Sequence, residues 1–392
     1  MKKIRVGILF GGRSGEHEVS LLSAASVLQA IDRRKYDVVP IGITKEGRWV
    51  TAGHAERLLG RGESGKHLRA GDPEATGPAA VLRKGESVLV PPVPSEALVP
   101  FEQKAGEVAQ SGSEHVLSVD VIFPVLHGTF GEDGTIQGLF ELAGMAYVGS
   151  GVLGSAAGMD KDAMKRLFQS AKLPMVKWVT FLRGEWEKSP KKIRARVEAA
   201  LKYPVFVKPA NLGSSVGISK AHDAKELGPA IELAAGFDRK IVVEQGVGGK
   251  GKARELEVAV LGNDEPEASV VGEVIPGKEF YDYEAKYLSE GSDLIVPAKL
   301  TKAETKQVRE MAIAAFRACD CAGLARVDFL MEPGRSGKIY VNEINTLPGF
   351  TSISMYPRLW AASGVAYPQL IDRLIALGME RRVDKDRNKY SL

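Results

Sequence analysis

The sequence predicts a mixed protein, with a doubly wound parallel α/β sheet at the N-terminus and α+β structure after it. Three observations predict this. Residues 4–43 run strand, glycine turn, helix, strand, which is the opening of a doubly wound sheet. Residues 254–345 are rich in strands. The length of 392 residues corresponds to two or three domains at ~150 residues each.

The N-terminal domain is expected to cover residues 1–150. Residues 52–113 are rich in Gly, Pro and charge, and we expect them to form a surface insertion with one short strand. The elements follow from apolar periodicity and turn residues. In chain order they are a strand at 4–10, a helix at 18–31, and strands at 38–43, 87–90 and 119–126, then a helix at 134–143 and a strand at 146–148.

A central domain is expected over residues 151–246, a C-terminal domain over 247–377, and a polar tail over 378–392 that is frayed from residue 381. The expected central elements are a helix at 160–171, a strand at 175–181, a helix at 187–201, a strand at 205–208, a helix at 223–235 and a strand at 240–244. The expected C-terminal elements are strands at 254–261 and 269–275, a helix at 301–318, strands at 325–331 and 338–345, and a helix at 367–377.

Composition excludes several classes of protein. The net charge of +4 argues against a nucleic-acid binder, and the basic helix near residue 191 has no interleaved aromatic residues. The longest charge-free stretch, residues 142–159, is too rich in glycine for a membrane span. Cys319 and Cys321 are interpreted as small core residues in a reducing compartment. We therefore expect a cytoplasmic protein with no nucleic-acid or membrane partner.

Lys208 ends an apolar strand, and the segment GSSVG follows it at residues 213–217. Burying an ammonium without a partner is costly, so the lysine needs an anionic neighbour. Glycines let backbone N–H groups approach a phosphate chain. The pattern indicates a phosphate loop; the alternative is a hairpin turn with an incidental lysine.

A second cluster lies on two strands. Residues two apart in a strand face the same side, so Arg326 lies with Asp328, and Glu343 lies with Asn345. If the two strands are neighbours, Asp328, Glu343 and Asn345 offer oxygen ligands for Mg²⁺. The alternative is a structural salt bridge between Arg326 and Glu343.

Three further segments carry polar groups. Gly349 follows Pro348 in a turn rich in hydroxyl groups, which suits an oxyanion or a carboxylate. Residues 280–287 (FYDYEAKY) are typical of a lid. Glu16 and His127 follow the first two strand ends, where either could be a helix cap only. A phosphate loop, a metal site and a lid together indicate phosphoryl transfer from a nucleotide.

Eight segments, in order, resemble those of the D-alanine–D-alanine ligase family of the ATP-grasp superfamily. They reach from residue 4 to about 377 and exclude residues 52–113. The segments are GGRSGEHEVS, HGTFGEDGTIQG, GSGVLGSAAGMDK, KPANLGSSVG, RELEVAVLGN, YDYEAKY, ARVDF and NEINTLPGFTSISMYP.

The resemblance implies an ATP-grasp fold with a Rossmann-like N-terminal domain, and ATP held between the central and C-terminal domains. The implied nucleotide and metal ligands are Lys161, Lys208, Ser214 and Ser215 for the phosphates, Glu244 for adenine, Glu255 for ribose, and Asp328, Glu343 and Asn345 for two Mg²⁺ or Mn²⁺ ions. The implied substrate contacts are Glu16 and His127 for the first substrate, Lys286 and Ser354 for the carboxylate of the second, Arg326 and the Gly349 N–H for the oxyanion, and Glu16, Ser214 and Tyr287 as a network that closes the lid.

The implied activity is ATP-dependent joining of two D-alanine molecules through an acyl phosphate, for peptidoglycan precursor synthesis, by a homodimer. A requirement for a monovalent cation is left open. One alternative is a D-alanine–D-lactate ligase, but Tyr287 and Lys286 in the lid favour the dipeptide enzyme. Another is a non-catalytic nucleotide-binding protein, although the metal ligands are present. A dinucleotide-binding dehydrogenase would need a GxGxxG segment after Phe10, which the sequence lacks.

Overall fold

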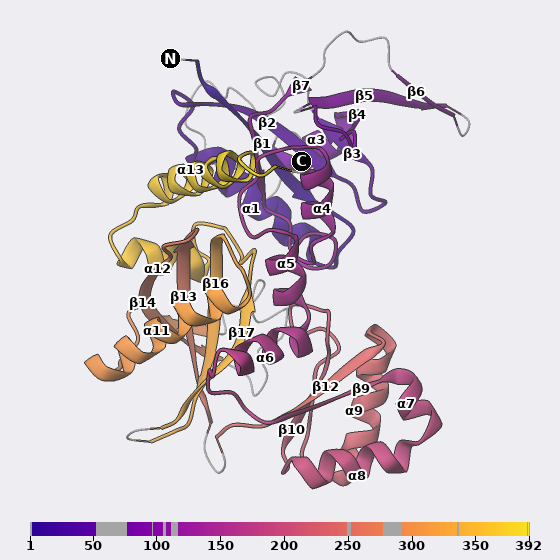
Figure 1. Cartoon of the computed structure of the whole chain (residues 1–392), viewed down its shortest axis with the longest axis vertical. Helices are drawn as coiled ribbons and strands as arrows, with labels where there is room; N and C mark the ends of the chain where they lie inside the picture. The colour runs from indigo at the N-terminus through magenta and orange to yellow at the C-terminus, as the bar shows by residue number, and fades with distance from the viewer. Residues whose placement is uncertain are drawn as a thin grey trace. The chain divides into compact units, whose positions relative to one another are not determined.

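The computed structural model describes residues 2–51, 77–95, 97–104, 107–110, 117–248, 252–276, 292–334, 337–389 and 391. Most of its elements are labelled in Figure 1. The chain forms two compact units, one of residues 1–152 with 347–392 and one of residues 153–346. The predicted lid, with Lys286 and Tyr287, lies outside the described residues, as does half of the predicted insertion. The described half of the insertion contains one helix and three strands, so the expectation of a single short strand is wrong. The division into three domains at residues 150 and 246 stays a prediction.

The first unit is built on one mixed sheet. Strands β1, β2 and β8 are parallel, and the remaining strands extend the sheet from β2 in antiparallel fashion. In spatial order the described strands are β6 (Glu107–Gln110), β5 (Ala97–Lys104), β4 (Glu86–Leu89), β3 (Trp49–Thr51), β2 (Tyr36–Ile43), β1 (Ile4–Gly11) and β8 (Val121–Pro124), with β7 (Leu117–Ser118) paired to β5. The side chains of Val6, Ile8 and Phe10 are completely buried, as a central parallel strand requires.

Helices pack on this sheet and complete the unit. They are α1 (His17–Ala30), α3 (Pro78–Lys84), α4 (Thr135–Leu142), α12 (Met355–Ala362) and α13 (Tyr367–Lys385). The predicted end of the last helix at residue 377, with a frayed tail after it, is wrong. Helix α13 continues to Lys385 because Lys385 and Arg381 both pair with Glu141. A second difference is that the predicted strand at 146–148 is a single bridge from Tyr147 to Ile122.

The second unit contains two antiparallel sheets. The four-stranded sheet has the order β11 (Ser219–Ala221), β10 (Val205–Pro209), β12 (Lys240–Gln245) and β9 (Trp178–Leu182). Helices α7 (Arg183–Lys188), α8 (Pro190–Ala200) and α9 (Ala224–Phe237) pack against it around one apolar core. The single helix predicted over 187–201 is wrong. Pro190 has no N–H to continue the helix, so α7 ends at Lys188 and α8 begins at Pro190.

The five-stranded sheet has the order β15 (Ser292–Ile295), β14 (Glu267–Pro276), β13 (Arg254–Gly262), β16 (Gly323–Met331) and β17 (Ile339–Asn345). Helix α11 (Lys302–Ala318) covers it and begins at a capping box formed by Thr301 and Glu304. Helices α5 (Val152–Met159), which the sequence analysis missed, and α6 (Lys161–Ser170) complete the unit. Met164 and Phe168 of α6 belong to the core of this sheet.

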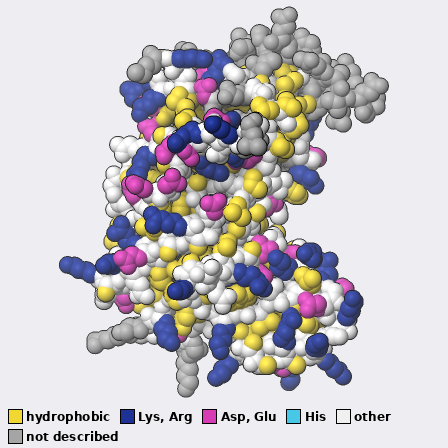
Figure 2. Space-filling model, in the orientation of Figure 1, with side chains coloured by type: hydrophobic (Ala, Val, Ile, Leu, Met, Phe, Trp, Pro, Cys, Tyr) yellow, Lys and Arg dark blue, Asp and Glu magenta, His cyan; other side chains and the backbone are white. Residues whose placement is uncertain are grey.

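The surface agrees with a nearly neutral chain. On the face drawn in Figure 2, basic and acidic side chains are interspersed with apolar ones. None of the described helices combines the length and the apolar character needed to cross a membrane.

Candidate active site

The segment after β10 has the strained backbone of a ligand-binding loop. Ser214 and Ser215 both have left-handed backbones, with φ of 50° and 60°. A residue other than glycine in this conformation costs about 1–3 kcal/mol, and residues strained in this way cluster at ligand sites. At Gly217, with φ of 71°, an added Cβ would lie 2.6 Å from the ring of Phe237. Only glycine fits there, so the loop geometry explains this part of the GSSVG segment.

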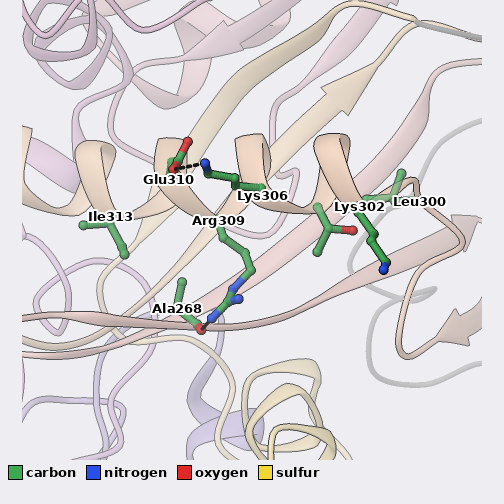
Figure 3. A pocket seen from close by; sticks show the side chains of 8 residues that line it. Ala268, Leu300, Lys302, Lys306, Arg309, Glu310 and Ile313 are labelled. Carbon is green, nitrogen blue, oxygen red and sulfur yellow. Dashed lines mark hydrogen bonds and ion pairs between the residues drawn. The ribbon is translucent and has the colours of Figure 1, made fainter.

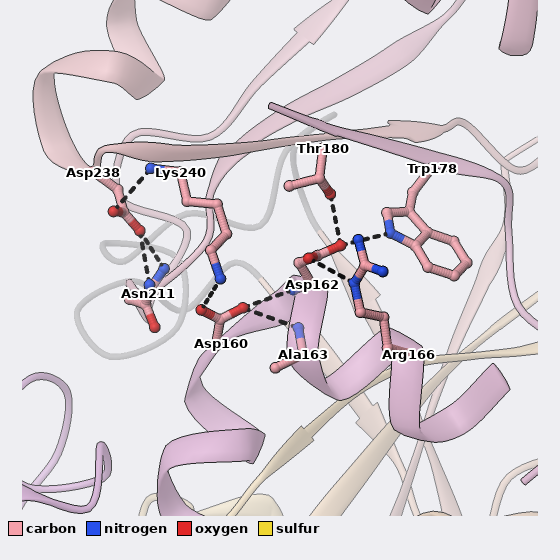
Figure 4. A network of polar contacts seen from close by, with 9 residues as sticks. All are labelled: Asp160, Asp162, Ala163, Arg166, Trp178, Thr180, Asn211, Asp238 and Lys240. Carbon is pink, nitrogen blue, oxygen red and sulfur yellow. Dashed lines mark hydrogen bonds and ion pairs between the residues drawn. The ribbon is translucent and has the colours of Figure 1, made fainter. Parts of the chain in front are cut away.

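Contacts on both sides hold this loop in place. Lys161 is buried, and its ammonium donates to the carbonyl oxygen of Leu212 at 2.7 Å. The backbone and side-chain N–H groups of Asn211 both donate to Asp238, at 2.8 and 3.0 Å (Figure 4). Lys161 follows the N-cap residue Asp160, which accepts from the ammonium of Lys240 at 2.6 Å. The first residues of the loop are therefore held in place against the N-terminal end of α6.

Lys208 lies in a buried group of three charges. Its ammonium is 2.7 Å from Oε2 of Glu244, and the ammonium of Lys165 on α6 is 3.1 Å from Oε1 of the same carboxylate. The three residues are 9% (Lys208), 3% (Glu244) and 0% (Lys165) exposed. Two cations around one anion leave an excess positive charge, which suits a polyanionic ligand.

The charges in this group control its protonation. Burial by itself would raise the pKa of Glu244, but the charges of Lys165 and Lys208 outweigh burial and hold that pKa at about 2. Burial would lower the pKa of Lys208, yet the neighbouring carboxylates, Glu244 first and then Glu343, raise it overall. Burial lowers the pKa of Lys165, against the charge of Glu244. Glu244 and Lys208 are thus ionised at neutral pH.

The predicted metal ligands lie on neighbouring strands, as the strand periodicity requires. Asp328 on β16 is directly opposite Glu343 on β17, and Arg326 is opposite Asn345. The register shifts just beyond this pair, so that Asn342 is the extra residue of a β-bulge. The bulge keeps Val341 in the core while Glu343 and Asn345 share the face of Asp328.

Arg326 is held between two carboxylates of this face. Its guanidinium makes a bidentate contact with Asp328, at 2.7 Å for each hydrogen bond. Its Nε also lies 3.1 Å from Oε2 of Glu257 on β13. Glu257 is directly opposite Asp328 in the sheet, so Glu257, Asp328 and Glu343 form one acidic row across three strands.

This face fits a magnesium site that a nucleotide completes. Among the described residues, no three or more His, Cys, Asp or Glu side chains are grouped closely enough to hold a metal by themselves. Asp328, Glu343 and the amide of Asn345 offer hard oxygen ligands, and Mg²⁺ in proteins usually takes one or two carboxylates and completes its shell with phosphates and water. Carboxylates directly opposite each other repel, and a cation between them relieves that repulsion.

In the first unit, Glu16 lies at the N-terminal end of α1 and is buried. The loop after β8 approaches it closely. Gly128 has a φ of 75°, and a Cβ at this position would lie 2.8 Å from Oε2 of Glu16. Ser14 links the two loops by donating to the carbonyl oxygen of His127 at 2.5 Å. The turns after β1 and β8 thus surround the buried carboxylate of Glu16, which could receive an ammonium group.

His127 connects this carboxylate loop to the turn that contains Gly349. Its Nδ1 is 3.0 Å from the carbonyl oxygen of Leu347, and its Nε2 is 3.0 Å from the hydroxyl of Ser23. A carbonyl oxygen can only accept, so Nδ1 carries the proton and Nε2 accepts from Ser23. The hydroxyl oxygen of Ser23 then accepts from the N–H of Phe350 at 3.4 Å. Both ring nitrogens are therefore engaged, and a direct bond from His127 to a substrate stays a prediction.

The same turn is fixed from its other side. Tyr367 donates to the carbonyl oxygen of Phe350 at 2.6 Å, and the Phe350 ring packs against the rings of Phe123 and Tyr367. Ser354, at the N-cap of α12, accepts from the N–H of Thr351 at 3.1 Å. The turn thus has a rigid backbone around the buried Gly349.

This geometry makes the first unit sensitive to acid. Burial lowers the pKa of His127, although Glu16 and Leu347 act in the opposite direction. The folded protein disfavours protonation of His127. The contribution of His127 to stability is therefore fully present above its ordinary pKa of 6.5 and is lost as the pH falls below that value. The free energy of unfolding of the wild type should therefore fall by up to ~1.4 kcal/mol per pH unit from this residue.

Urea unfolding of the wild type and of His127→Gln, at pH 7, 6 and 5, checks this. Glutamine is neutral and can both donate and accept, so the variant should lack this part of the acid dependence. Equal pH dependence in the two proteins would contradict the neutral, buried histidine.

One open groove in the second unit is separate from these residues. It lies beside α11 and β14, has a volume of about 420 Å³, and contains none of the candidate residues in its lining (Figure 3). Two of its cations, Arg309 and Lys306, already have partners. Arg309 donates to the carbonyl oxygen of Ala268 at 2.7 Å, and Lys306 lies 3.8 Å from Glu310.

Comparison with known proteins identifies the family. Models of the D-ala D-ala ligase N-terminus and C-terminus match residues 5–150 and 167–376. The chain belongs to the D-alanine–D-alanine ligase family. It is 47% identical to a D-alanine–D-alanine ligase of Bacillus cytotoxicus, over 100% of both chains, and 48% identical to one of Heliobacterium modesticaldum, over 99% of this chain and 98% of the relative.

Solved structures of the family agree with the fold. The D-alanine–D-alanine ligase of Coxiella burnetii is 33% identical with a TM-score of 0.79, over 99% of this chain and 97% of that one. The VanG D-Ala:D-Ser ligase of Enterococcus faecalis is 35% identical with a TM-score of 0.75, over 96% of this chain and all of that one. The predicted fold class, ATP-grasp with a doubly wound N-terminal sheet, is confirmed. The sheet differs from the expected all-parallel form, because its parallel pairs are those of β1 with β2 and β8, and the other described strands pair antiparallel.

Within this D-alanine–D-alanine ligase fold, the second unit groups most of the predicted nucleotide and metal ligands. Lys161, Lys208 and Glu244 lie in the contacts described above, and the charge of Glu255 acts on Lys208. Lys165 and Glu257 were not among the predicted residues. Lys165 shares the buried stripe of α6 with Lys161, which the sequence spacing shows, whereas Glu257 meets Asp328 only through the pairing of β13 with β16.

Proposed function

We propose that this protein joins two D-alanine molecules to D-alanyl-D-alanine at the expense of ATP, and so supplies a peptidoglycan precursor in the cytoplasm. The observation that carries the proposal is the pair of carboxylates, Asp328 and Glu343, opposite each other beside Arg326. In a chain of this family, an intact pair of this kind favours a working enzyme over a non-catalytic nucleotide-binding protein.

In the first step, a carboxylate oxygen of the first D-alanine attacks the γ-phosphorus of ATP. The bond from phosphorus to the β,γ-bridging oxygen breaks, ADP leaves, and an acyl phosphate forms. Lys208 and Lys161 supply positive charge to the phosphates, and the N–H groups of Ser214 and Ser215 approach them from the strained loop. Glu244 accepts from the adenine amino group, and Glu255 binds the ribose.

In the second step, the amine of the second D-alanine attacks the acyl carbon and loses a proton. The phosphate leaves with the oxygen that came from the carboxylate. A carboxylate oxygen is a poor leaving group and a phosphate is a good one, which is why ATP is consumed. Arg326 and the N–H of Gly349 stabilise the oxyanion that forms between attack and departure.

Asp328, Glu343 and Asn345 are proposed to hold two Mg²⁺ or Mn²⁺ ions, which when bound neutralise phosphate charge. On the substrate side, Glu16 receives the ammonium of the first D-alanine, and His127 fixes the Gly349 turn beside it. Lys286 and Ser354 receive the carboxylate of the second D-alanine. A network of Glu16, Ser214 and Tyr287 closes the lid.

We also propose that the enzyme is a homodimer, as the family resemblance implies. A requirement for a monovalent cation is best tested directly, by comparing turnover in potassium and sodium buffers.

Phosphate release in the presence of ATP and Mg²⁺ tests the function. We expect release with D-alanine and little with L-alanine. Mixtures of D-alanine with D-lactate or D-serine then test the second substrate, with the products identified by mass spectrometry. Efficient formation of a D-alanine–D-lactate ester at pH 7 would replace the proposed activity by the ester-forming alternative.

A further inference from the structure

Lys165 is completely buried, and no step of the proposed reaction uses it. We infer that Lys165 is a positioning residue: it is the permanent counter-ion of Glu244, and it thereby lets Lys208 leave Glu244 for the phosphates of ATP. The inference rests on the proposed function, in which Glu244 and Lys208 bind ATP.

The two lysines contact different oxygens of the Glu244 carboxylate. Lys165 contacts Oε1 of Glu244 at 3.1 Å, and Lys208 contacts Oε2 at 2.7 Å. The lysines differ in freedom. Lys165 is 0% exposed on a helix whose neighbouring Met164 is in the core, whereas Lys208 is 9% exposed at the end of a strand beside the phosphate loop. Lys165 is therefore the fixed partner and Lys208 the exchangeable one.

This division solves an electrostatic problem. With a single lysine as partner, moving that lysine to the phosphates would leave a buried carboxylate without compensation, which is strongly unfavourable. With Lys165 in place, Glu244 stays ionised and its Oε2 becomes available. An ionised oxygen accepts from the amino group of adenine and repels the carbonyl oxygen that hypoxanthine carries at the same ring position. Lys165 thus supports both ATP affinity and the preference for adenine.

The same ammonium reaches the strand with the proposed metal ligands. Lys165 donates to the carbonyl oxygen of Asn342 at 3.4 Å, and Asn342 is the bulge residue next to Glu343. The adjacent residue of α6, Met164, accepts from the N–H of Ile344 at 3.3 Å. One turn of α6 therefore fixes the base-binding carboxylate and the bulge of β17 together.

The test replaces Lys165 by methionine, which has a similar length and no charge. The remaining pair of Glu244 and Lys208 is neutral overall, so the variant should fold. We expect the KM for ATP and the Kd for ADP to rise at least 10-fold, while kcat at saturating ATP stays within about threefold. The ratio of kcat/KM for ATP to that for inosine triphosphate should fall at least fivefold. Lys306→Met, which removes an exposed lysine of α11, is the matched control and should behave as the wild type.

A double-mutant cycle with Glu244→Gln separates positioning from a general disturbance. Without the carboxylate there is nothing for Lys165 to compensate, so adding Lys165→Met should change the KM for ATP less than threefold. An equal increase in both backgrounds, or an unchanged KM and nucleotide preference in Lys165→Met, would overturn the inference. If Lys165→Met does not fold, Lys165→Gln carries the same measurements with the same thresholds. Dipeptide synthesis by the wild type is checked first, so that failure of the proposed function is recognised separately.

Discussion

Replacing Glu343 by glutamine is expected to lower kcat at least ~1,000-fold, which corresponds to about 4 kcal/mol of transition-state stabilisation. Glutamine keeps the size of the side chain and removes the charge that we propose holds the metal. The loss should therefore persist at saturating ATP and D-alanine. Steady-state phosphate release measures it, and the increase in melting temperature that ATP with Mg²⁺ gives the wild type should largely disappear.

The same substitution should not destabilise the protein without ligands. Glu343 lies directly opposite Asp328, and like charges in that position repel. Glu343 also supports the charge of buried Lys208, so the two effects oppose each other. The melting temperature of the ligand-free variant should therefore stay close to that of the wild type. Glu310→Gln, on the exposed face of α11, is the control and should keep full turnover. Turnover of Glu343→Gln within tenfold of the wild type would remove the metal-site assignment.

Replacing Arg326 by lysine is expected to lower kcat about 100-fold, the usual effect of removing one oxyanion donor. Lysine keeps the positive charge but cannot form the fork that now contacts Asp328 twice and Glu257 once. The KM for ATP should change much less than kcat, because the oxyanion exists only during the reaction.

Arg254→Lys provides a control in the same sheet. Arg254 makes a bidentate contact with Glu273, at 2.7 Å for each bond, and no catalytic role is proposed for it. This variant should lose some stability and keep its kcat. A similar kcat for Arg326→Lys and the wild type would show that charge alone, without the planar fork, is sufficient.

The shared face of Arg326, Asp328, Glu343 and Asn345 could be predicted from the sequence because strand periodicity is local. Knowing that Asp328 follows Arg326 by two residues is enough to place both on one face, and the register of β16 with β17 then brings Glu343 opposite. Glu257 was not predicted because it lies on a third strand. The spacing of residues along one strand does not determine the order of strands in an antiparallel sheet. The pairing of β13 with β16 was needed to complete the acidic row.

Lys165 shows a second limit. A lysine on the apolar stripe of a helix is visible in the sequence, but its partner, Glu244, is 79 residues away on β12. The helix break at Pro190 follows from the proline itself and was predictable from the sequence. The extension of α13 depends on Glu141, which is distant in the chain. Local patterns thus predict elements and faces, and long-range charge pairs decide which side chains act together.

The proposed reaction passes through an acyl phosphate, and an isotope measurement detects that intermediate by the fate of its oxygen. D-Alanine labelled with ¹⁸O in its carboxylate is incubated with the enzyme, ATP and Mg²⁺, and the phosphate and dipeptide are analysed by mass spectrometry. One ¹⁸O atom should appear in the inorganic phosphate for each dipeptide formed, because the attacking carboxylate oxygen leaves with the phosphate. Unlabelled phosphate accompanying labelled dipeptide would show that the carboxylate is never phosphorylated, and would contradict the mechanism.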